Sequence, residues 1–204
     1  MSAIQPVEAV PAFYNDLDAS LAHALNLLEK GVKDRRSAMH TFTVATNGSD
    51  GTPQLRTVVN RGFDRATRIL RFHTDARSPK IAELKADPRV AVHIYDRWAK
   101  IQLRLDARAS VHTDGQVRAS AWEGTRDFSR ICYRVTAAPG DTVERPDDVA
   151  FTEGAAPDEG EENFVAVTLE VHALEWLYLA ADGPRRARFA WDQAGTLSQN
   201  WLVP

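Results

Sequence analysis

Apolar residues near the start of the chain recur at the spacing of a helix. They follow one another at intervals of three or four residues and are Leu17, Leu21, Leu25, Leu28 and Val32. This spacing places them on one face of an α-helix over about residues 13–32. Asn15 or Asp16 can cap its first turn, and Gly31 lies near its end. The sequence therefore predicts an amphipathic N-terminal helix that packs against the rest of the fold.

Beyond Met39 apolar and polar positions alternate, which is the pattern of half-buried β-strands. The pattern predicts strands at residues 40–46, 54–60, 68–74, 90–95, 99–112, 164–172, 174–179 and 185–191. Segment 99–112 is the clearest, because every second residue from Ala99 to Val111 is apolar. The odd-numbered residues from Val165 to Val171 are likewise expected to point inward. Residues 47–51 read Asn-Gly-Ser-Asp-Gly and predict a hairpin turn.

Two short helices are predicted between the strands. Ser78 followed by Pro79 suits an N-cap and a first helical residue, and Asp87-Pro88 ends that helix. Residues 117–122 predict the second. So few helices do not supply the crossovers of a parallel sheet. The expected fold is mainly β, an antiparallel barrel with peripheral helices, formed by a single domain over residues 1–204.

The composition excludes several classes of function. The chain has 204 residues and a net charge of −3, and its arginines form no shared stripe, so no nucleic-acid surface is expected. Cys132 is the only cysteine and the six histidines lack ligand spacing, so neither a disulfide nor a metal site is expected. The motifs of P-loop, dinucleotide-binding and serine-hydrolase proteins do not occur.

The sequence also bears on location. No apolar run is long enough for a membrane span, and the first residues do not resemble a signal peptide. With a single cysteine, a reducing cytoplasmic location is expected and no membrane partner.

The net charge hides an acidic segment. Residues 141–162 contain nine acids and one base, and the other residues carry 24 bases and 19 acids, a net of +5. The loop over about residues 137–162 is predicted to be a solvated excursion between the two halves of the barrel, without chemistry of its own. The positive remainder leaves room for a small anionic ligand.

Basic and hydroxyl residues gather around the helix start at Ser78. Arg56 and residues 57–59 lie in one predicted strand, residues 72–74 in another, and Lys80 in the first helical turn. Free N–H groups at a helix N-terminus, together with the charges of Arg56 and Lys80, suit a phosphate dianion. A second interpretation stays open, in which Ser78 only caps the helix and both cations are ordinary surface residues.

Six short motifs occur in an order that resembles one known family. They are Arg56-x-Val58-x-x-Arg61, Phe72-His73-Thr74, Ser78-x-Lys80, Asp87-Pro88-Arg89-Val90-Ala91, Gln102 in a long strand, and Arg188-Phe189 before Trp201-Leu202-Val203-Pro204. The set resembles the pyridoxamine 5′-phosphate oxidase family over about residues 40–112 and 164–204. The resemblance implies the FMN-binding split barrel, an antiparallel barrel that forms a homodimer with one FMN in each of two clefts between the subunits.

The resemblance also assigns roles to residues. Those implied to bind FMN are Arg56, Thr57, Val58, Val59, His73, Thr74, Ser78, Lys80, Gln102, Arg126 and Arg188. Arg56 and Lys80 would hold the phosphate with Thr74 and Ser78, and residues 57–59 would lay backbone along the flavin. His73 would pack beside the ring. Gln102 and Arg188 would come from the partner subunit and bind the polar edge of the flavin.

A looser likeness to an uncharacterised, oxidase-related subgroup places Arg126 near the partner's flavin. For Arg126 and Arg130, ordinary surface salt bridges are the open alternative. For Gln102 the alternative is a solvated side chain.

Some positions depart from the family. Pro79 stands where the oxidases carry a second basic residue. Pro184 and Arg186 stand at the places of an Arg-x-His pair that handles pyridoxal substrates. Arg61 and Arg186 are the candidates for substrate contact, and no catalytic residue is assigned.

The resemblance thus implies an FMN-dependent oxidoreductase that acts on an unknown small-molecule substrate. Two alternatives stay open. One is a binder of FMN, haem or deazaflavin that is non-catalytic or differently catalytic, and the other is a cofactor-free interaction barrel.

Overall fold

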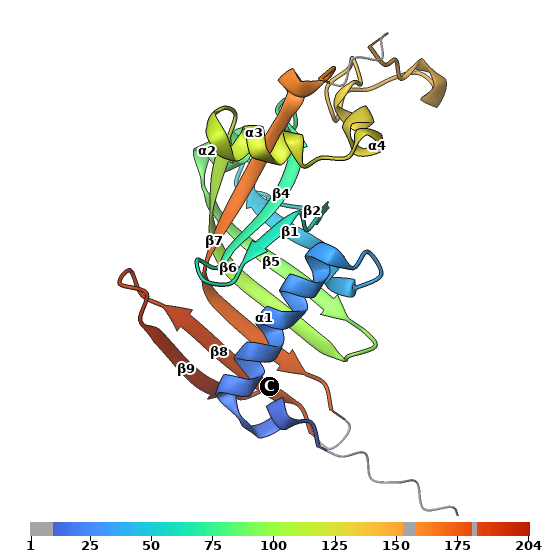
Figure 1. Cartoon of the computed structure of the whole chain (residues 1–204). Coiled ribbons are helices and arrows are strands. Elements are labelled where there is room, and N and C mark those ends of the chain that lie inside the picture. The colour runs from blue at the N-terminus through green and yellow to red at the C-terminus, as the bar shows by residue number, and fades with distance from the viewer. Residues whose placement is uncertain (1–9, 153–157, 181–182) are drawn as a thin grey trace, which may run out of the picture.

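Antiparallel β-strands dominate the computed structural model, which describes residues 10–152, 158–180 and 183–204 (Figure 1). Within these residues the strand order is β2-β1-β5-β6-β7-β4-β3, and β8 and β9 continue from β7. The strands are β1 (Thr41–Asn47), β2 (Pro53–Val59), β3 (Gly62–Asp64), β4 (Ile69–Asp75), β5 (Arg89–Asp96), β6 (Ile101–His112), β7 (Phe164–Tyr178), β8 (Arg185–Trp191) and β9 (Leu197–Leu202). The predicted mainly β, antiparallel architecture is confirmed.

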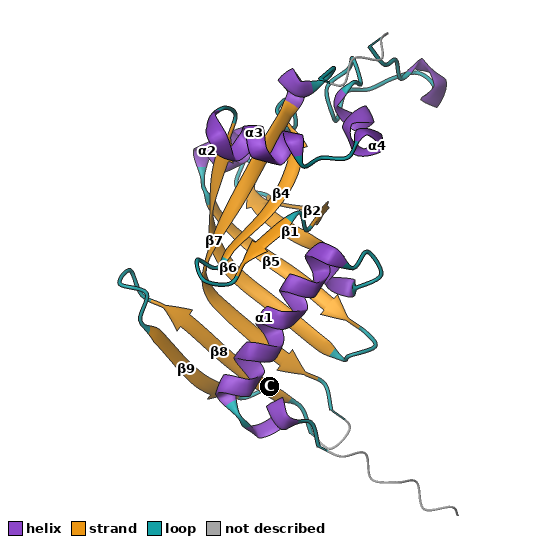
Figure 2. Ribbon diagram, viewed as in Figure 1, coloured by secondary structure: helices purple, strands orange, loops and turns teal. Residues whose placement is uncertain are grey.

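Helices lie around the sheet (Figure 2). They are α1 (Leu17–Lys33), α2 (Pro79–Ala86), α3 (Gly115–Glu123) and α4 (Asp127–Arg130), with 3-10 turns η1 (Ala12–Asn15), η2 (Ala38–His40), η3 (Ile131–Tyr133), η4 (Pro146–Asp148) and η5 (Glu161–Asn163). Asp16 caps α1 by accepting a hydrogen bond of 2.8 Å from the Ala19 N–H. No helix in the described parts of the chain is long and apolar enough to cross a membrane.

Strand β7 corrects one prediction, because the segments 164–172 and 174–179 form a single strand. Opposite β6, Asp106 pairs with Ala173 and Ala107 with Val171, so His172 is an extra residue in the ladder. A bulge of this kind shifts the alternation by one position. The buried positions accordingly change from odd numbers, ending at Ala173, to the even numbers Leu174 and Trp176. In the sequence, this change of alternation looks like the end of one strand and the start of another.

The main core lies between α1 and the sheet. In Figure 1, α1 crosses one face of the sheet from β1 towards β8. Ala24 and Leu28 from α1 are buried with Leu103, Leu105 and Trp176 from β6 and β7. Packing of this kind explains the apolar face of the helix, because burial of each large side chain contributes about 1.5–3 kcal/mol.

A second core holds the other end of β7. Trp122 of α3, Tyr133 of η3 and Phe164 of β7 form an aromatic cluster, with 5.1 Å between the ring centroids of Tyr133 and Phe164. The cluster joins the segment after α3 to the sheet, and this segment carries one wall of the candidate site.

The acidic segment runs outward from this second core (Figure 1). The prediction that this segment is a solvated excursion is wrong in part, because two of its acids make ion pairs with arginines outside the segment. Glu159 pairs with Arg134 at 2.9 Å and Glu161 pairs with Arg118 at 2.8 Å. Residues 153–157 of the predicted loop, including Glu153, lie outside the described residues.

Candidate functional site

A cavity of about 360 Å³ opens beside β2, β4 and the start of α2. We call it the β2–β4 cavity. It is lined by Arg56, Thr57, Val58, Val59, Arg61, His73, Thr74, Lys80, Thr125, Ser129, Cys132 and Tyr133. The first eight of these are residues that the sequence predicted for cofactor or substrate contact. The structure therefore brings most of the predicted site together around one space.

Lys80 lies at the centre of a small polar cluster where α2 begins. Its Nζ donates to Thr74 Oγ1 at 3.0 Å and also to Ser78 Oγ. Burial lowers the pKa of Lys80, and the charge of Arg56 lowers it further. Ser78 occupies the predicted N-cap position, but its hydroxyl makes no cap to the helix backbone and serves Lys80 instead.

Arg56 has a carboxylate partner that the sequence analysis did not identify. Its Nη2 lies 2.7 Å from Glu83 Oε2, and its Nη1 donates to Thr46 Oγ1. The hydroxyl of Thr46 in turn donates to the same carboxylate. Glu83 follows Lys80 by three residues on α2, so helical spacing could have placed it on the same face. The expected full charge of Arg56 is therefore partly neutralised.

His73 forms an uncharged wall of the cavity. Its ring packs edge-on against Phe164, with 4.9 Å between centroids, and its Nε2 is buried without a hydrogen-bond partner. Burial lowers the pKa of His73 to about 3, helped by the charges of Arg71 and Arg61. The imidazole is therefore neutral near pH 7.

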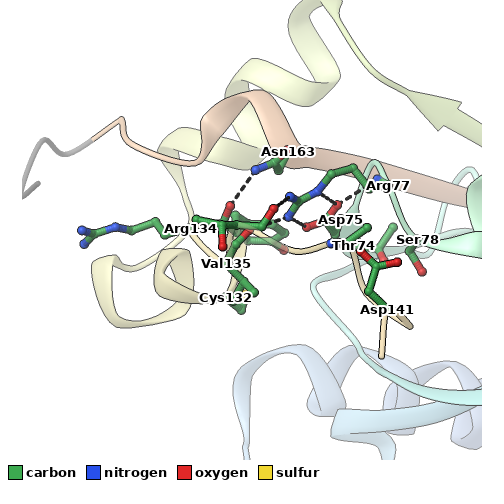
Figure 3. Close-up of polar contacts among 12 residues, drawn as sticks. Thr74, Asp75, Arg77, Ser78, Cys132, Arg134, Val135, Asp141 and Asn163 are labelled. Atoms are coloured by element: carbon green, nitrogen blue, oxygen red, sulfur yellow. Dashed lines mark hydrogen bonds and ion pairs between the residues drawn. The ribbon is translucent and has the colours of Figure 1, made fainter. Parts of the chain in front are cut away.

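A further wall of the cavity is formed by residues that the sequence did not predict as site residues. They are four residues from the segment between α3 and the acidic loop, which contains α4 and η3: Thr125, Ser129, Cys132 and Tyr133. Arg77 holds the end of this segment, as Figure 3 shows: its guanidinium pairs with Asp75 and donates to the carbonyls of residues 135 and 136 at 2.8 and 3.0 Å.

Asn163 holds the same segment from the other side, because its Nδ2 donates to the Tyr133 carbonyl at 2.9 Å. Contacts between distant parts of the chain thus position this wall. A local sequence pattern does not predict such contacts.

Three of the predicted residues that do not line the β2–β4 cavity lie on strands β6 and β8. Gln102 on β6 accepts through its Oε1, which lies 3.2 Å from His93 Nε2 on β5. On β8, Arg188 pairs with Glu175 at 3.0 Å and with Asp106 at 3.3 Å, and Arg186 pairs with Glu175 at 2.6 Å. These residues do not meet the cavity of their own chain.

The two arginines after α3 differ in their surroundings. Arg126 is exposed and lines a neighbouring cavity with His73 and Arg61. Arg130 stacks its guanidinium over Trp122, 4.5 Å from the ring centroid. Arg130 therefore supports the second core.

Known proteins that resemble this chain belong to the family that the sequence motifs indicate. The profile of the family described as "Pyridoxamine 5'-phosphate oxidase, FMN-binding domain" matches residues 22–113. A pyridoxine/pyridoxamine 5′-phosphate oxidase 2 of Arabidopsis thaliana is 36% identical over 104 residues, which cover 48% of this chain and 52% of that protein. An oxidase of Rubrobacter xylanophilus is 30% identical over 87 residues, covering 43% of this chain and 38% of that protein. The matched region thus spans about half or less of these curated relatives.

Solved structures share the fold over almost the whole chain. A pyridoxamine 5′-phosphate oxidase-related, FMN binding protein of Nostoc punctiforme is 21% identical with a TM-score of 0.75, over 96% of this chain and 99% of that one. PhzG of Burkholderia lata is 20% identical with a TM-score of 0.72, over 98% and 100%. The chain is thus similar to the pyridoxamine 5′-phosphate oxidase family over residues 22–113, and it has the split-barrel fold of the solved structures.

Proposed function

We propose that this chain binds FMN in the β2–β4 cavity and works as an FMN-dependent oxidoreductase on a small molecule. The observation that carries the proposal is the donor cluster at the start of α2. Lys80 Nζ donates to both Thr74 Oγ1 and Ser78 Oγ beside the cavity. A phosphate group accepts several charge-assisted hydrogen bonds, so it can take the place of these internal contacts.

The lining of the cavity fits an anionic, planar ligand. Its described residues include three cations and no carboxylate. Within the described sheet β2 pairs only with β1, so its other edge leaves backbone groups of residues 57–59 for the polar rim of a ring. Because Glu83 already holds one side of Arg56, Lys80 is the principal cation for the phosphate.

Bound FMN would supply hydride transfer to or from the substrate. The chain's own contribution is to hold and orient the cofactor. Lys80 and Arg56 fix one end, the edge of β2 aligns the ring, and neutral His73 packs beside it. Gln102 and Arg188 fit the further proposal of a homodimer in which each subunit completes its partner's site, because both lie away from the cavity of their own chain.

An FMN titration followed by flavin fluorescence tests cofactor binding. The Lys80→Gln variant is expected to bind FMN at least about tenfold more weakly, because a charge-assisted hydrogen bond is lost. Lys85→Gln is the matched control, since Lys85 has the same charge in the same helix but is exposed near its end. A colourless protein whose thermal stability does not respond to FMN would remove the proposal.

One observation favours a second candidate, a split-barrel binder that does not oxidise pyridoxal compounds. Arg186, the candidate for substrate contact near the C-terminus, is held by Glu175 at 2.6 Å and has a side chain only 29% exposed. Oxygen consumption with pyridoxamine 5′-phosphate separates the two candidates. Robust turnover by the FMN-loaded protein rules out the binder, and FMN binding without turnover of any pyridoxal compound favours it.

A further inference from the structure

One carboxylate on the face of the sheet that points away from the main core binds three arginines. Glu175 lies on β7, between β6 and β8, and its side chain is only 15% exposed. Its Oε1 accepts from Arg188 Nη1 at 3.0 Å. Its Oε2 accepts from Arg186 Nη2 at 2.6 Å and from Arg104 Nη1 at 3.4 Å. Burial alone would raise the pKa of Glu175, but the hydrogen bonds and charges of these arginines hold that pKa below its usual value. Glu175 is therefore a largely buried anion.

The bulge at His172 puts Glu175 on this face of the sheet. Before the bulge, even-numbered residues of β7 such as Glu170 point away from the core, and after it the odd-numbered residues do. In a regular strand the alternation would continue, and Glu175 would face the core as Val171 does. Bulges are frequent next to functional sites, where they re-aim a side chain. The backbone of β7 thus directs one acid towards the arginines of its two neighbouring strands.

Glu175 also lies between two residues that the sequence predicted for flavin contact. Arg188 is directly opposite it on β8. On the other side, Gln102 of β6 is opposite Leu177, two residues along β7 and therefore on the same face. Neither Gln102 nor Arg188 lines the β2–β4 cavity of its own chain. The carboxylate is thus at the centre of the surface that faces the partner's FMN in the proposed homodimer.

The contacts of Glu175 fix the direction of Arg188. Its Nη1 is held by Glu175 at 3.0 Å and its Nη2 by Asp106 at 3.3 Å. The Arg188 side chain is still 40% exposed, and these two bonds leave further N–H donors for a ligand. An arginine that is already held loses less conformational freedom when it binds, which favours affinity.

We propose that Glu175 is a positioning residue that holds Arg188 in the orientation in which it binds the FMN of the partner subunit. The proposal rests on the proposed function and its homodimer. Arg104 and Arg186 balance the charge of the carboxylate, so Glu175 does not cancel the charge that Arg188 offers. Three arginines against Glu175 and Asp106 leave the cluster with one positive charge in excess. That excess suits an anionic cofactor.

An FMN titration followed by flavin fluorescence tests this role. Glu175→Gln is expected to bind FMN about tenfold more weakly than the wild-type chain, because Arg188 loses one of its two holds. Glu170→Gln is the matched control, since Glu170 is exposed on the same strand, and it is expected to stay within about twofold of wild type. In an Arg188→Gln background, Glu175→Gln is expected to weaken FMN binding no further, because its effect passes through Arg188. Wild-type affinity of Glu175→Gln, or a full additional loss in the Arg188→Gln background, would overturn the proposal.

Mixed dimers test whether Glu175 acts on the site of the partner. When Lys80→Gln chains and Glu175→Gln chains are co-expressed, each mixed dimer has one cavity that keeps Lys80 and faces an intact Glu175. A fraction of the sites is therefore expected to bind FMN with wild-type affinity, although neither variant alone has such sites. If these sites do not appear, Glu175 acts within its own chain and the proposal is wrong.

The Glu175→Asp variant guards against misfolding of Glu175→Gln. It keeps a negative charge among the arginines but is one methylene shorter, so a looser hold on Arg188 and a few-fold weaker binding of FMN are expected. If Glu175→Gln does not fold, Glu175→Asp decides both experiments, and wild-type affinity overturns the proposal.

The same titrations separate this proposal from the proposed function. If the wild-type chain does not bind FMN, both are wrong. If Lys80→Gln weakens FMN binding and the Glu175 variants do not, the proposed function stands and the role of Glu175 is wrong.

Discussion

Replacing Arg77 with methionine is expected to destabilise the protein by about 2 kcal/mol, whereas the same replacement at Arg89 is expected to cost little. The two arginines occupy the same local arrangement, two residues after an aspartate. In each, the arginine backbone N–H and Nε donate to Oδ1 of the aspartate, and Nη2 donates to Oδ2. For Arg77 with Asp75 these three distances are 2.8, 3.0 and 2.7 Å. For Arg89 with Asp87 they are 3.0, 2.9 and 2.6 Å. The pair is therefore an internal control.

The difference between them is tertiary. Asp75 is buried, and Arg77 also donates to two backbone carbonyls of the segment after η3. Hydrogen bonds from a charged group contribute about 1.5–3 kcal/mol. The Arg77 side chain is 28% exposed, so water recovers part of this and a value near the lower end follows. Arg89 is 78% exposed and its pair lies in solvent, where such pairs contribute little.

Urea unfolding of both variants measures the difference, with the slope against denaturant checked for constancy. The expected loss corresponds to a fall of about 4–8 °C in Tm for a chain of this size. Arg77→Met should also weaken FMN binding, because the wall that carries Tyr133 is released. Equal losses of stability at the two positions would refute the reasoning, since they would show that the tertiary contacts of Arg77 contribute nothing.

Three other predictions concern packing, backbone and titration. Leu105→Ala is expected to cost about 3 kcal/mol in urea unfolding, because the side chain is fully buried. Gly160→Ala should lower Tm more than Gly51→Ala. Both glycines have a positive φ, +85° at Gly160 and +80° at Gly51, so the backbone strain of the two substitutions is similar. Only at Gly160 would the new Cβ come within 2.8 Å of the Tyr133 backbone, because Gly51 faces open space. The pKa of His73 is lowered to about 3 from 6.5, so the unfolded chain binds more protons between these values and stability falls as pH drops through that window. His73→Phe is expected to remove this part of the pH dependence, measured by urea unfolding over about pH 4–7.

Local patterns predicted the elements that face the core on one side only. The strand over residues 185–191 has the predicted bounds, and α2 begins after Ser78 and ends before Asp87 as expected. Strand β9 escaped prediction because most of its residues are exposed, so it has no alternation to detect. Strand β3 is only three residues long, which is too short to show an alternating pattern.

The candidate site divides in the same way. The sequence predicts residues 56–59, 72–74 and 78–80 as parts of the site because they lie in or next to regular elements with recognisable motifs. The wall at Thr125 and Tyr133 was not predicted, because its position depends on Arg77 and Asn163, which bind its carbonyls from distant parts of the chain. Backbone carbonyls carry no side-chain signature, so contacts of this kind leave no trace in a single sequence.

Charge is where the sequence average misleads most. The net charge of −3 combines an acidic segment with a remainder of +5, yet neither figure describes what an anion would meet. Part of the acidic segment is engaged with Arg118 and Arg134 beside the second core. The neighbouring charges that lower the pKa of His73 are Arg71 and Arg61. Exposed charges are largely screened beyond about 8 Å at physiological salt, so the pairing of individual arginines, rather than the total, decides whether this chain attracts an anion.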